Sequence, residues 1–207
     1  AFRNITNALQ KQIFNLSKEE INEFLLTIND SSNKLFELLQ NMLKWSLSQT
    51  NNIKVNLQEQ AILPISQKAV DALQYNAAEK NITINNTIDN TIQANIDDNI
   101  IETIIRNYIS NAIKFTPNNG TILLYSEILN DKKIKVGVKD NGIGISENDQ
   151  QKIFNIEADT STVGNSSEKG TGLGLILCKE LAEKMNANVG FNSEIKQGSD
   201  FYIIFNM

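Results

Sequence analysis

Two asparagines and a lysine share one face of a helix predicted over residues 97–116. Asn107 and Asn111 are four residues apart and Lys114 follows Asn111 by three, so helical geometry brings the three side chains into line. Isoleucines recur at helical spacing through the same segment and predict an apolar face packed on a core. Carboxamides at the border of a core need hydrogen-bond partners. The segment alone leaves two interpretations open: capped or solvated amides on a core helix, or a polar site.

The first glycine-rich stretch, DNGIGI at residues 140–145, follows a predicted strand. Asn141-Gly142 is a strong turn signal, so a plain hairpin turn is one interpretation. Gly144, which lies between two isoleucines, instead suggests a backbone that passes close to a flat group. A carboxylate at the strand end, Asp140, can accept a hydrogen bond from an exocyclic amine, and this is the chemistry that reads adenine.

The second glycine-rich stretch, GTGLGL at residues 170–175, runs directly into a predicted helix. Glycines there expose backbone N–H groups at a helix N-terminus, an arrangement suited to anion binding. No strand leads directly into the stretch, so it is not a Rossmann fingerprint, and no Gly-Lys-Ser/Thr follows, so it is not a Walker A loop. Each glycine motif is weak evidence when taken alone.

The elements predicted around these motifs define an α+β fold. The chain begins with predicted helices over 1–16 and 17–48, followed by a polar linker over 49–60 with a short extended piece at 53–57. A helix over 62–80, two short strands within 81–96 and the helix over 97–116 come next. The remainder is predicted to hold antiparallel strands over 121–128 and 133–139, a mobile segment over 146–169, a helix over 173–185, and strands near 187–194 and 200–206. Ser17 with Glu20 is a capping-box signature for the second helix. Helices and mainly antiparallel strands in separate runs predict an α/β sandwich with a mixed, mainly antiparallel sheet.

Two domains are expected, an N-terminal antiparallel helical hairpin over 1–50 and an α/β sandwich over 51–207. A hairpin buries little apolar surface by itself, so we expect a second copy to complete a four-helix bundle and form a homodimer. The alternative is a hairpin that folds back on its own domain. Cys178 is the single cysteine and is predicted to lie in the core.

Composition excludes several classes of function. The net charge of −5 and the absence of a basic stripe argue against nucleic acid or an anionic membrane as a partner. No apolar run approaches the roughly 20 residues of a membrane span, and one cysteine permits no internal disulfide, so a cytoplasmic location is expected. Histidine is absent, which excludes a histidine-based triad, zinc site or proton relay within these residues.

Taken together, the motifs resemble the N, G1, F and G2 boxes of the sensor histidine kinase ATP-binding domain, a member of the GHKL (Bergerat-fold) ATPases. They occur in the family's order, with Phe154 between the two glycine stretches. SNAIKFTP at 110–117 and GTGLGLILCKELAEKMNANV at 170–189 are especially similar to that family. LLQNMLKWSLSQTNNIK at 38–54 is similar to the end of the second helix of its dimerisation and phosphotransfer domain, so the resemblance covers nearly the whole chain.

The resemblance implies ATP and Mg²⁺ as ligands. Asn111 would coordinate Mg²⁺ through its amide oxygen with Asn107 beside it, and Lys114 would neutralise phosphate charge. Residues 146–169 would form an ATP lid with Phe154 as its apolar latch. Phe115 stands where the family often has tyrosine. The ATP-binding set so implied is Asn107, Asn111, Lys114, Asp140, Gly142, Gly144, Ile145, Phe154, Gly170, Thr171, Gly172, Leu173, Gly174 and Leu175.

Asn107 distinguishes branches of this superfamily. Its hydrolysing members typically place a glutamate there as general base for water, and an amide cannot take a proton. The resemblance therefore implies a kinase that holds ATP for transfer to a histidine and then to a response-regulator aspartate. Two rivals remain open: a nucleotide-gated dimerisation module without catalysis, and a protein serine kinase of the anti-sigma type on the same fold.

The family's phosphoacceptor histidine is missing. Either the chain starts just past the box that carries it, or Asn4–Gln10 is a decayed box with Asn7 in place of the histidine. Arms of a hairpin should be comparable, yet 1–16 spans about 24 Å and 18–48 about 45 Å at helical rise. Truncation is the favoured expectation. In either case the chain as given is not expected to autophosphorylate on histidine.

Overall fold

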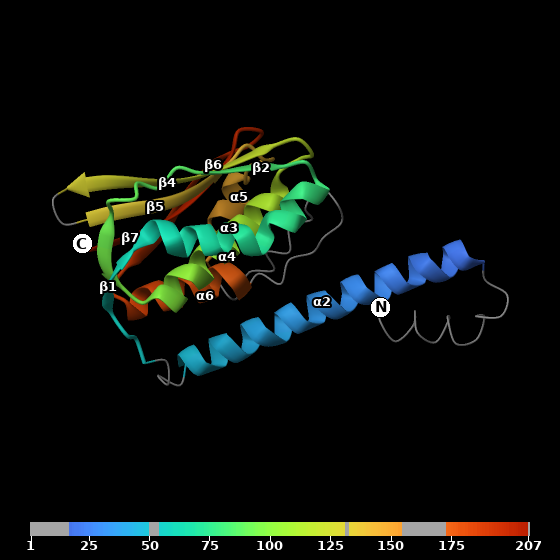
Figure 1. Ribbon diagram of the computed structural model, residues 1–207, viewed down its shortest axis with the longest axis horizontal. Coiled ribbons are helices and arrows are strands. Elements are labelled where there is room, and N and C mark those ends of the chain that lie inside the picture. The colour runs from blue at the N-terminus through green and yellow to red at the C-terminus, as the bar shows by residue number, and fades with distance from the viewer. Residues whose placement is uncertain (1–16, 50–53, 131–132, 155–172, 207) are drawn as a thin grey trace. The chain divides into compact units, whose positions relative to one another are not determined.

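The computed structural model describes residues 17–49, 54–130, 133–154 and 173–206 (Figure 1). Contacts divide the chain into two units, Ala1–Leu47 and Ser48–Met207, and each is described here by itself. The predicted helix over 1–16 lies outside the described residues. No helix in the described part of the chain combines the length and apolarity that a membrane crossing requires.

The first unit is dominated by helix α2, Lys18–Gln49. Its start confirms the predicted capping box: the backbone N–H of Ser17 donates to the Glu20 carboxylate at 2.8 Å, and the N–H of Glu20 donates to the Ser17 hydroxyl at 3.2 Å. Several large apolar side chains of this helix are solvent-facing within the single chain. They are Leu25, Leu26, Leu35 and Leu39.

The second unit is built on a five-stranded sheet with the order β2-β4-β5-β7-β6. Strand β2 runs parallel to β4, and the other neighbours are antiparallel, so the predicted mixed, mainly antiparallel sheet of an α+β fold is confirmed. The bounds are β2 Thr83–Asn86, β4 Thr121–Asn130, β5 Lys133–Asp140, β6 Asn188–Glu194 and β7 Gly198–Asn206. A separate two-stranded ribbon pairs β1, Gln58–Ala61, with β3, Gln93–Ile96.

Three helices form the second layer and pack on one face of the sheet (Figure 1). They are α3 Ile62–Glu79, α4 Asp98–Phe115 and α6 Leu173–Lys184. The isoleucines at helical spacing on α4 are buried between the layers, with Ile101, Ile104 and Ile109 all 0% exposed. Alternate residues of β5 supply the facing surface. Cys178 is buried in the same core, as predicted.

The extended piece predicted at 53–57 is wrong in position, because the strand is β1 at Gln58–Ala61. Pairing decides its place: Gln58 lies opposite Ile96 and Ala61 opposite Gln93. The backbone N–H of Asn56 is held by the Asp97 carboxylate at 2.9 Å, which fixes the chain just before the strand. The sequence QEQA carries no apolar alternation, so local pattern favoured the apolar residues upstream.

The buried face of α4 provides a test of this packing. Ile104→Ala is expected to lower the free energy of unfolding by about 2–5 kcal/mol, because it removes buried methylene groups and leaves a cavity. Ile128→Ala is a matched control, since Ile128 is 57% exposed, and its loss is expected to stay within about 0.5 kcal/mol. Urea unfolding followed by circular dichroism measures both. Equal losses for the two variants would contradict the assigned core.

Candidate functional site

Helix α4 is fixed at its start by the side chain of the residue that precedes it and at its end by a side chain from a distant segment. At its start the buried Asp97 carboxylate accepts from the backbone N–H groups of Asn99 and Ile100, which is an N-cap. At its end the Lys80 ammonium donates to the carbonyl oxygens of Ile113 and Lys114 at 2.7 and 3.0 Å. A cation there also opposes the negative end of the helix dipole. The face that carries the predicted polar residues is therefore held in place.

The Asn107 side chain links α4 to the start of α6. Its Nδ2 donates to the carbonyl of Thr103 at 2.9 Å, one turn earlier in the same helix. This contact fixes the amide orientation, and Oδ1 faces Gly174, where a Cβ would lie only 2.6 Å from it. A larger residue at 174 would push the amide aside. The first asparagine of the α4 motif and the last glycine of the second glycine stretch thus lie against each other.

The C-terminal end of α4 also contacts the first glycine stretch. The carbonyl of Phe115 accepts from the backbone N–H of Ile143 at 3.2 Å. The Lys114 ammonium lies 5.0 Å from the centre of the Phe115 ring, within the range of a cation–π contact. The structure therefore brings the α4 motif and the 140–145 loop together, although 25 residues or more separate them in sequence.

Asp140, the last residue of β5, is buried beside this loop and is 6% exposed. Its Oδ1 accepts from the backbone N–H groups of Gly142 at 2.8 Å and Ser199 at 3.2 Å. Burial raises the pKa of this carboxyl above its ordinary value, although the two N–H donors oppose that rise by stabilising the charged form. Both hydrogen bonds use Oδ1, so Oδ2 is left for a hydrogen-bond donor from a ligand.

Two glycines let the 140–145 loop pack directly on the β6–β7 turn. Gly144 has a φ of +70°, and a Cβ there would overlap the carbonyl oxygen of Glu194. Gly198 has a φ of +96°, and a Cβ there would overlap the carbonyl oxygen of Asp140. Both positions need left-handed backbone and have no room for a side chain. The backbone N–H of Lys196 donates to the Ile143 carbonyl at 2.7 Å and joins the two segments.

Helix α5, Glu147–Gln150, follows the loop and is tied to it. The Gln150 amide nitrogen donates to the carbonyl oxygens of Ile145 and Ser193 at 2.9 and 3.0 Å. Phe154 packs on Phe191 of β6, with ring centres 5.8 Å apart. The predicted latch residue therefore lies over β6 at the C-terminal end of the segment that the structure describes here.

The structure gathers most of the predicted residues that it describes into one region. The α4 face, the 140–145 loop and the first turn of α6, with Leu173, Gly174 and Leu175, are joined by the contacts above. Gly170, Thr171 and Gly172 lie outside the described residues, as does the part of the predicted lid beyond Phe154. Sequence reasoning missed Lys80 and Ser199, since each acts on a partner more than 30 positions away and neither belongs to a motif.

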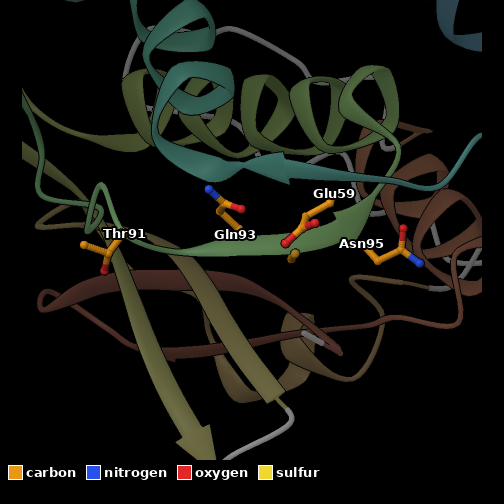
Figure 2. Close-up of a pocket in the computed structure, with 5 residues that line it drawn as sticks. Glu59, Thr91, Gln93 and Asn95 are labelled. Atoms are coloured by element: carbon orange, nitrogen blue, oxygen red, sulfur yellow. The ribbon is translucent and has the colours of Figure 1, made fainter.

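A separate hollow of about 590 Å³ lies on the β1–β3 ribbon (Figure 2). Glu59, Thr91, Gln93 and Asn95 line it, and all four side chains are exposed. None of the predicted site residues lines this hollow. It is an open depression, which Ala94 also lines, and it is separate from the site on α4.

Comparison with known proteins assigns the family. Residues 96–207, which are 112 of the 207 residues, match the family described as histidine kinase-, DNA gyrase B- and HSP90-like ATPase. This match covers more than half of the chain, and the chain belongs to that family. The predicted resemblance to a GHKL ATPase is confirmed.

The curated relatives that this chain matches include proteins named as histidine kinases and sensory kinases. The histidine-protein kinase BarA of Escherichia coli is 28% identical over 190 residues, covering 89% of this chain and 21% of its own length. The sensory kinase SasA of Synechocystis is 30% identical over 166 residues, covering 80% of this chain and 43% of its own length. The chain thus spans about a fifth of BarA and less than half of SasA.

Two solved structures share the fold. Full-length ShkA in complex with AMPPNP matches with a TM-score of 0.74 and 24% identity, over 94% of this chain and 40% of that one. Histidine kinase ThkA in complex with response regulator protein TrrA matches with a TM-score of 0.73 and 20% identity, over 99% of this chain and 58% of that one. At these identities the likeness establishes the fold alone.

The raised pKa of Asp140 predicts a pH dependence of stability. A carboxyl whose folded pKa exceeds its unfolded value binds its proton more tightly in the folded state, so its contribution to the unfolding free energy falls as pH rises. The quantity to follow is the unfolding free energy of wild type minus that of Asp140→Asn. This difference is expected to fall as the pH rises from 3.8, the ordinary pKa of the carboxyl, through its raised pKa in the folded state. Urea unfolding across this pH range measures the difference.

Asp89→Asn is the control for this measurement. Thr91 hydrogen bonds lower the pKa of the exposed Asp89 carboxyl, so its stabilising contribution is present above 3.8 and is lost as pH falls through the folded pKa. The two variants should therefore give pH trends of opposite sign. Trends of the same sign would show that burial does not dominate the titration of Asp140.

Proposed function

We propose that this chain is the ATP-binding core of a two-component sensor histidine kinase. It binds Mg-ATP and presents the γ-phosphoryl group to a histidine, from which a response-regulator aspartate receives it. The observation that carries the proposal is the orientation of Asn107, whose Nδ2 is bound to Thr103 and whose Oδ1 faces the start of α6 at Gly174.

An amide in that position favours transfer over hydrolysis. A general base must take a proton from water, and a carboxamide cannot do so. Phosphoryl transfer needs mainly positioning and neutralisation of charge. Asn107 and Lys114 lie on the rigid α4 face and supply a polar oxygen and a positive charge without a base. This residue set therefore suits a kinase that keeps ATP intact until an acceptor arrives.

The residues present fit a magnesium ion shared with phosphates. Amide oxygens are suitable hard ligands for Mg²⁺, which usually keeps few protein ligands and takes others from phosphate and water. Among the described residues no group of three or more Cys, Asp or Glu side chains gathers as a self-sufficient metal site. Asn111, with Asn107 beside it, would hold the ion, and the ion would neutralise triphosphate charge when bound.

The base of the nucleotide is assigned to the buried end of the site. Asp140 keeps Oδ2 for a donor such as the exocyclic amine of adenine, and its Oδ1 is fixed by two backbone N–H groups. The related ShkA structure holds AMPPNP and the related ThkA structure holds the response regulator TrrA. These complexes support an adenine nucleotide and a response regulator as the partners of this chain.

A transfer assay tests the proposal directly. The sequence contains no histidine, so the chain is mixed with a separately supplied first helix that carries one, together with γ-labelled ATP and Mg²⁺. Acid-labile label on the supplied helix is the expected result. Asn111→Ala should reduce the labelling by about 100-fold or more, because the proposed magnesium ligand is lost.

The other outcomes identify the rival functions. Acid-stable label on a separate protein would indicate a serine kinase, and nucleotide binding without any transfer would indicate a gated binding module. Asn107→Gln keeps an amide and should leave ATP hydrolysis low, whereas Asn107→Glu supplies a carboxylate and should raise hydrolysis by about tenfold or more. Wild-type turnover equal to that of a dedicated ATPase would contradict the kinase assignment.

The proposed kinase core is a homodimer formed through α2. Leu25, Leu35 and Leu39 are each more than half exposed in the single chain, and their spacings of ten and four residues place them on one side of the helix. Such an apolar stripe is a liability unless another surface covers it. A second copy of the same helix, in a four-helix bundle, supplies a matching surface.

Charge placed on this stripe is expected to dissociate the dimer. Leu25→Glu with Leu39→Glu should convert the chain to a monomer, because it would bury carboxylates between the helices. Sedimentation equilibrium measures the mass, and Ile128→Glu on the second unit is the control that should leave it unchanged. A monomeric wild type, or a double variant that remains dimeric, would contradict this interface.

A further inference from the structure

Ser193 and Ser199 lie opposite each other on β6 and β7, next to the buried carboxylate of Asp140. The strand register pairs the two serines, and their hydroxyl oxygens are 2.9 Å apart. Ser199 is 8% exposed, and its backbone N–H donates to Oδ1 of Asp140. The two hydroxyl groups therefore belong to the same small polar cluster as the proposed base-binding carboxylate.

The contacts of Ser193 fix the direction of its hydroxyl proton. Its Oγ lies 2.9 Å from the backbone nitrogen of Ile145, which can only donate, and 3.0 Å from the carbonyl oxygen of Gly198, which can only accept. A serine hydroxyl has one proton and two lone pairs. The proton points to Gly198, and Ile145 occupies one lone pair. The remaining lone pair of Ser193 is available to Ser199.

The same count fixes the proton of Ser199. Since Ser193 has no second proton, the 2.9 Å contact between the hydroxyls is a hydrogen bond only if Ser199 donates it. Ser199 then has no proton left for a ligand and can act only as an acceptor. Asp140, whose Oδ1 accepts from the backbone N–H of Ser199, offers its Oδ2 as a second acceptor. The cluster therefore offers oxygen lone pairs and no hydroxyl donor to a bound base.

Ser193 is held firmly in this position. Its carbonyl oxygen accepts from the Gln150 amide at 3.0 Å, and the same amide nitrogen binds the carbonyl of Ile145. Its hydroxyl and its main chain are thus both tied to the loop that carries Asp140 and Ile145. Small movements of the β6–β7 turn cannot release the Ser199 proton without breaking several hydrogen bonds together.

We propose that Ser193 is a positioning residue that sets the base selectivity of the site. By holding the Ser199 proton it keeps the cluster an acceptor, which favours a purine with an amine at position 6 over one with a carbonyl there. This inference rests on the proposed ATP site. It assigns a selectivity role to a side chain that is not expected to touch the nucleotide.

A comparison of ATP with ITP tests the role, because the two differ in the group at position 6 and in the protonation of the adjacent ring nitrogen. Calorimetric titration of the full chain gives the ratio of their dissociation constants. Ser193→Ala frees the Ser199 hydroxyl to donate to the carbonyl of ITP, so the preference for ATP should fall by about fivefold, mainly through tighter ITP binding. Ser193→Thr keeps a hydroxyl and should keep the wild-type ratio.

Two more variants separate selectivity from support of the loop. Ser199→Ala removes the hydroxyl oxygen that acts as an acceptor. The preference of this variant for ATP over ITP should also fall, but through weaker ATP binding. Ser126→Ala removes a hydroxyl of β4 whose hydrogen-bond partner is Asp89, and it should leave both affinities unchanged. If Ser193→Ala is poorly folded, the two single variants Ser199→Ala and Ser193→Thr still give the ratio of the ATP and ITP dissociation constants.

The outcomes distinguish this inference from the function on which it rests. Equal weakening of ATP and ITP in Ser193→Ala, or an unchanged ratio in both alanine variants, would overturn the selectivity role and leave the ATP site standing. A wild type that prefers ATP, with ratios that fall in the two expected ways, supports it. A wild type that binds neither nucleotide would overturn the proposed function and this inference with it.

Discussion

The site depends on close backbone packing between the 140–145 loop and the β6–β7 turn. Gly144 and Gly198 each bring a backbone carbonyl to a place where a side chain would otherwise lie. This contact leaves no room for a side chain between the two backbones. It therefore joins the end of β5, the start of β7 and the loop between β5 and α5 into one rigid corner. Asp140 can then be buried with a defined orientation, since the same corner supplies both backbone donors to its Oδ1.

Helix α4 supplies the second rigid part, and its two faces have different tasks. One face buries isoleucines against the sheet and provides much of the stabilisation of the second unit. The other carries the polar residues, which keep their positions because the helix cannot slide or fray. Asp97 fixes its first turn and Lys80 its last, and Phe115 joins that last turn to the glycine loop. A site on such an element is more accurately positioned than one on free loops.

The sequence predicted what is local and missed what is not. Helical spacing located α4 and the Ser17–Glu20 pair located the start of α2, since each signal lies within a few residues of the element it describes. Strand β1 was misplaced because its polar sequence becomes a strand only by pairing with β3. Lys80, Ser193 and Ser199 were missed for a related reason. Their roles come from partners that only the folded chain brings near, and no spacing rule encodes those contacts.

The directions of the hydroxyl protons of Ser193 and Ser199 also affect which ligand groups this site can bind. Heavy-atom positions alone would let Ser199 either donate or accept, and a purine with either group at position 6 could then be accommodated. The contacts of Ser193 remove that freedom, because Ile145 and Gly198 can each act in only one sense. A recognition site can thus be selective through residues that do not touch the ligand. Burial strengthens the effect, since an unmatched donor or acceptor in a buried site costs more than the same mismatch in water.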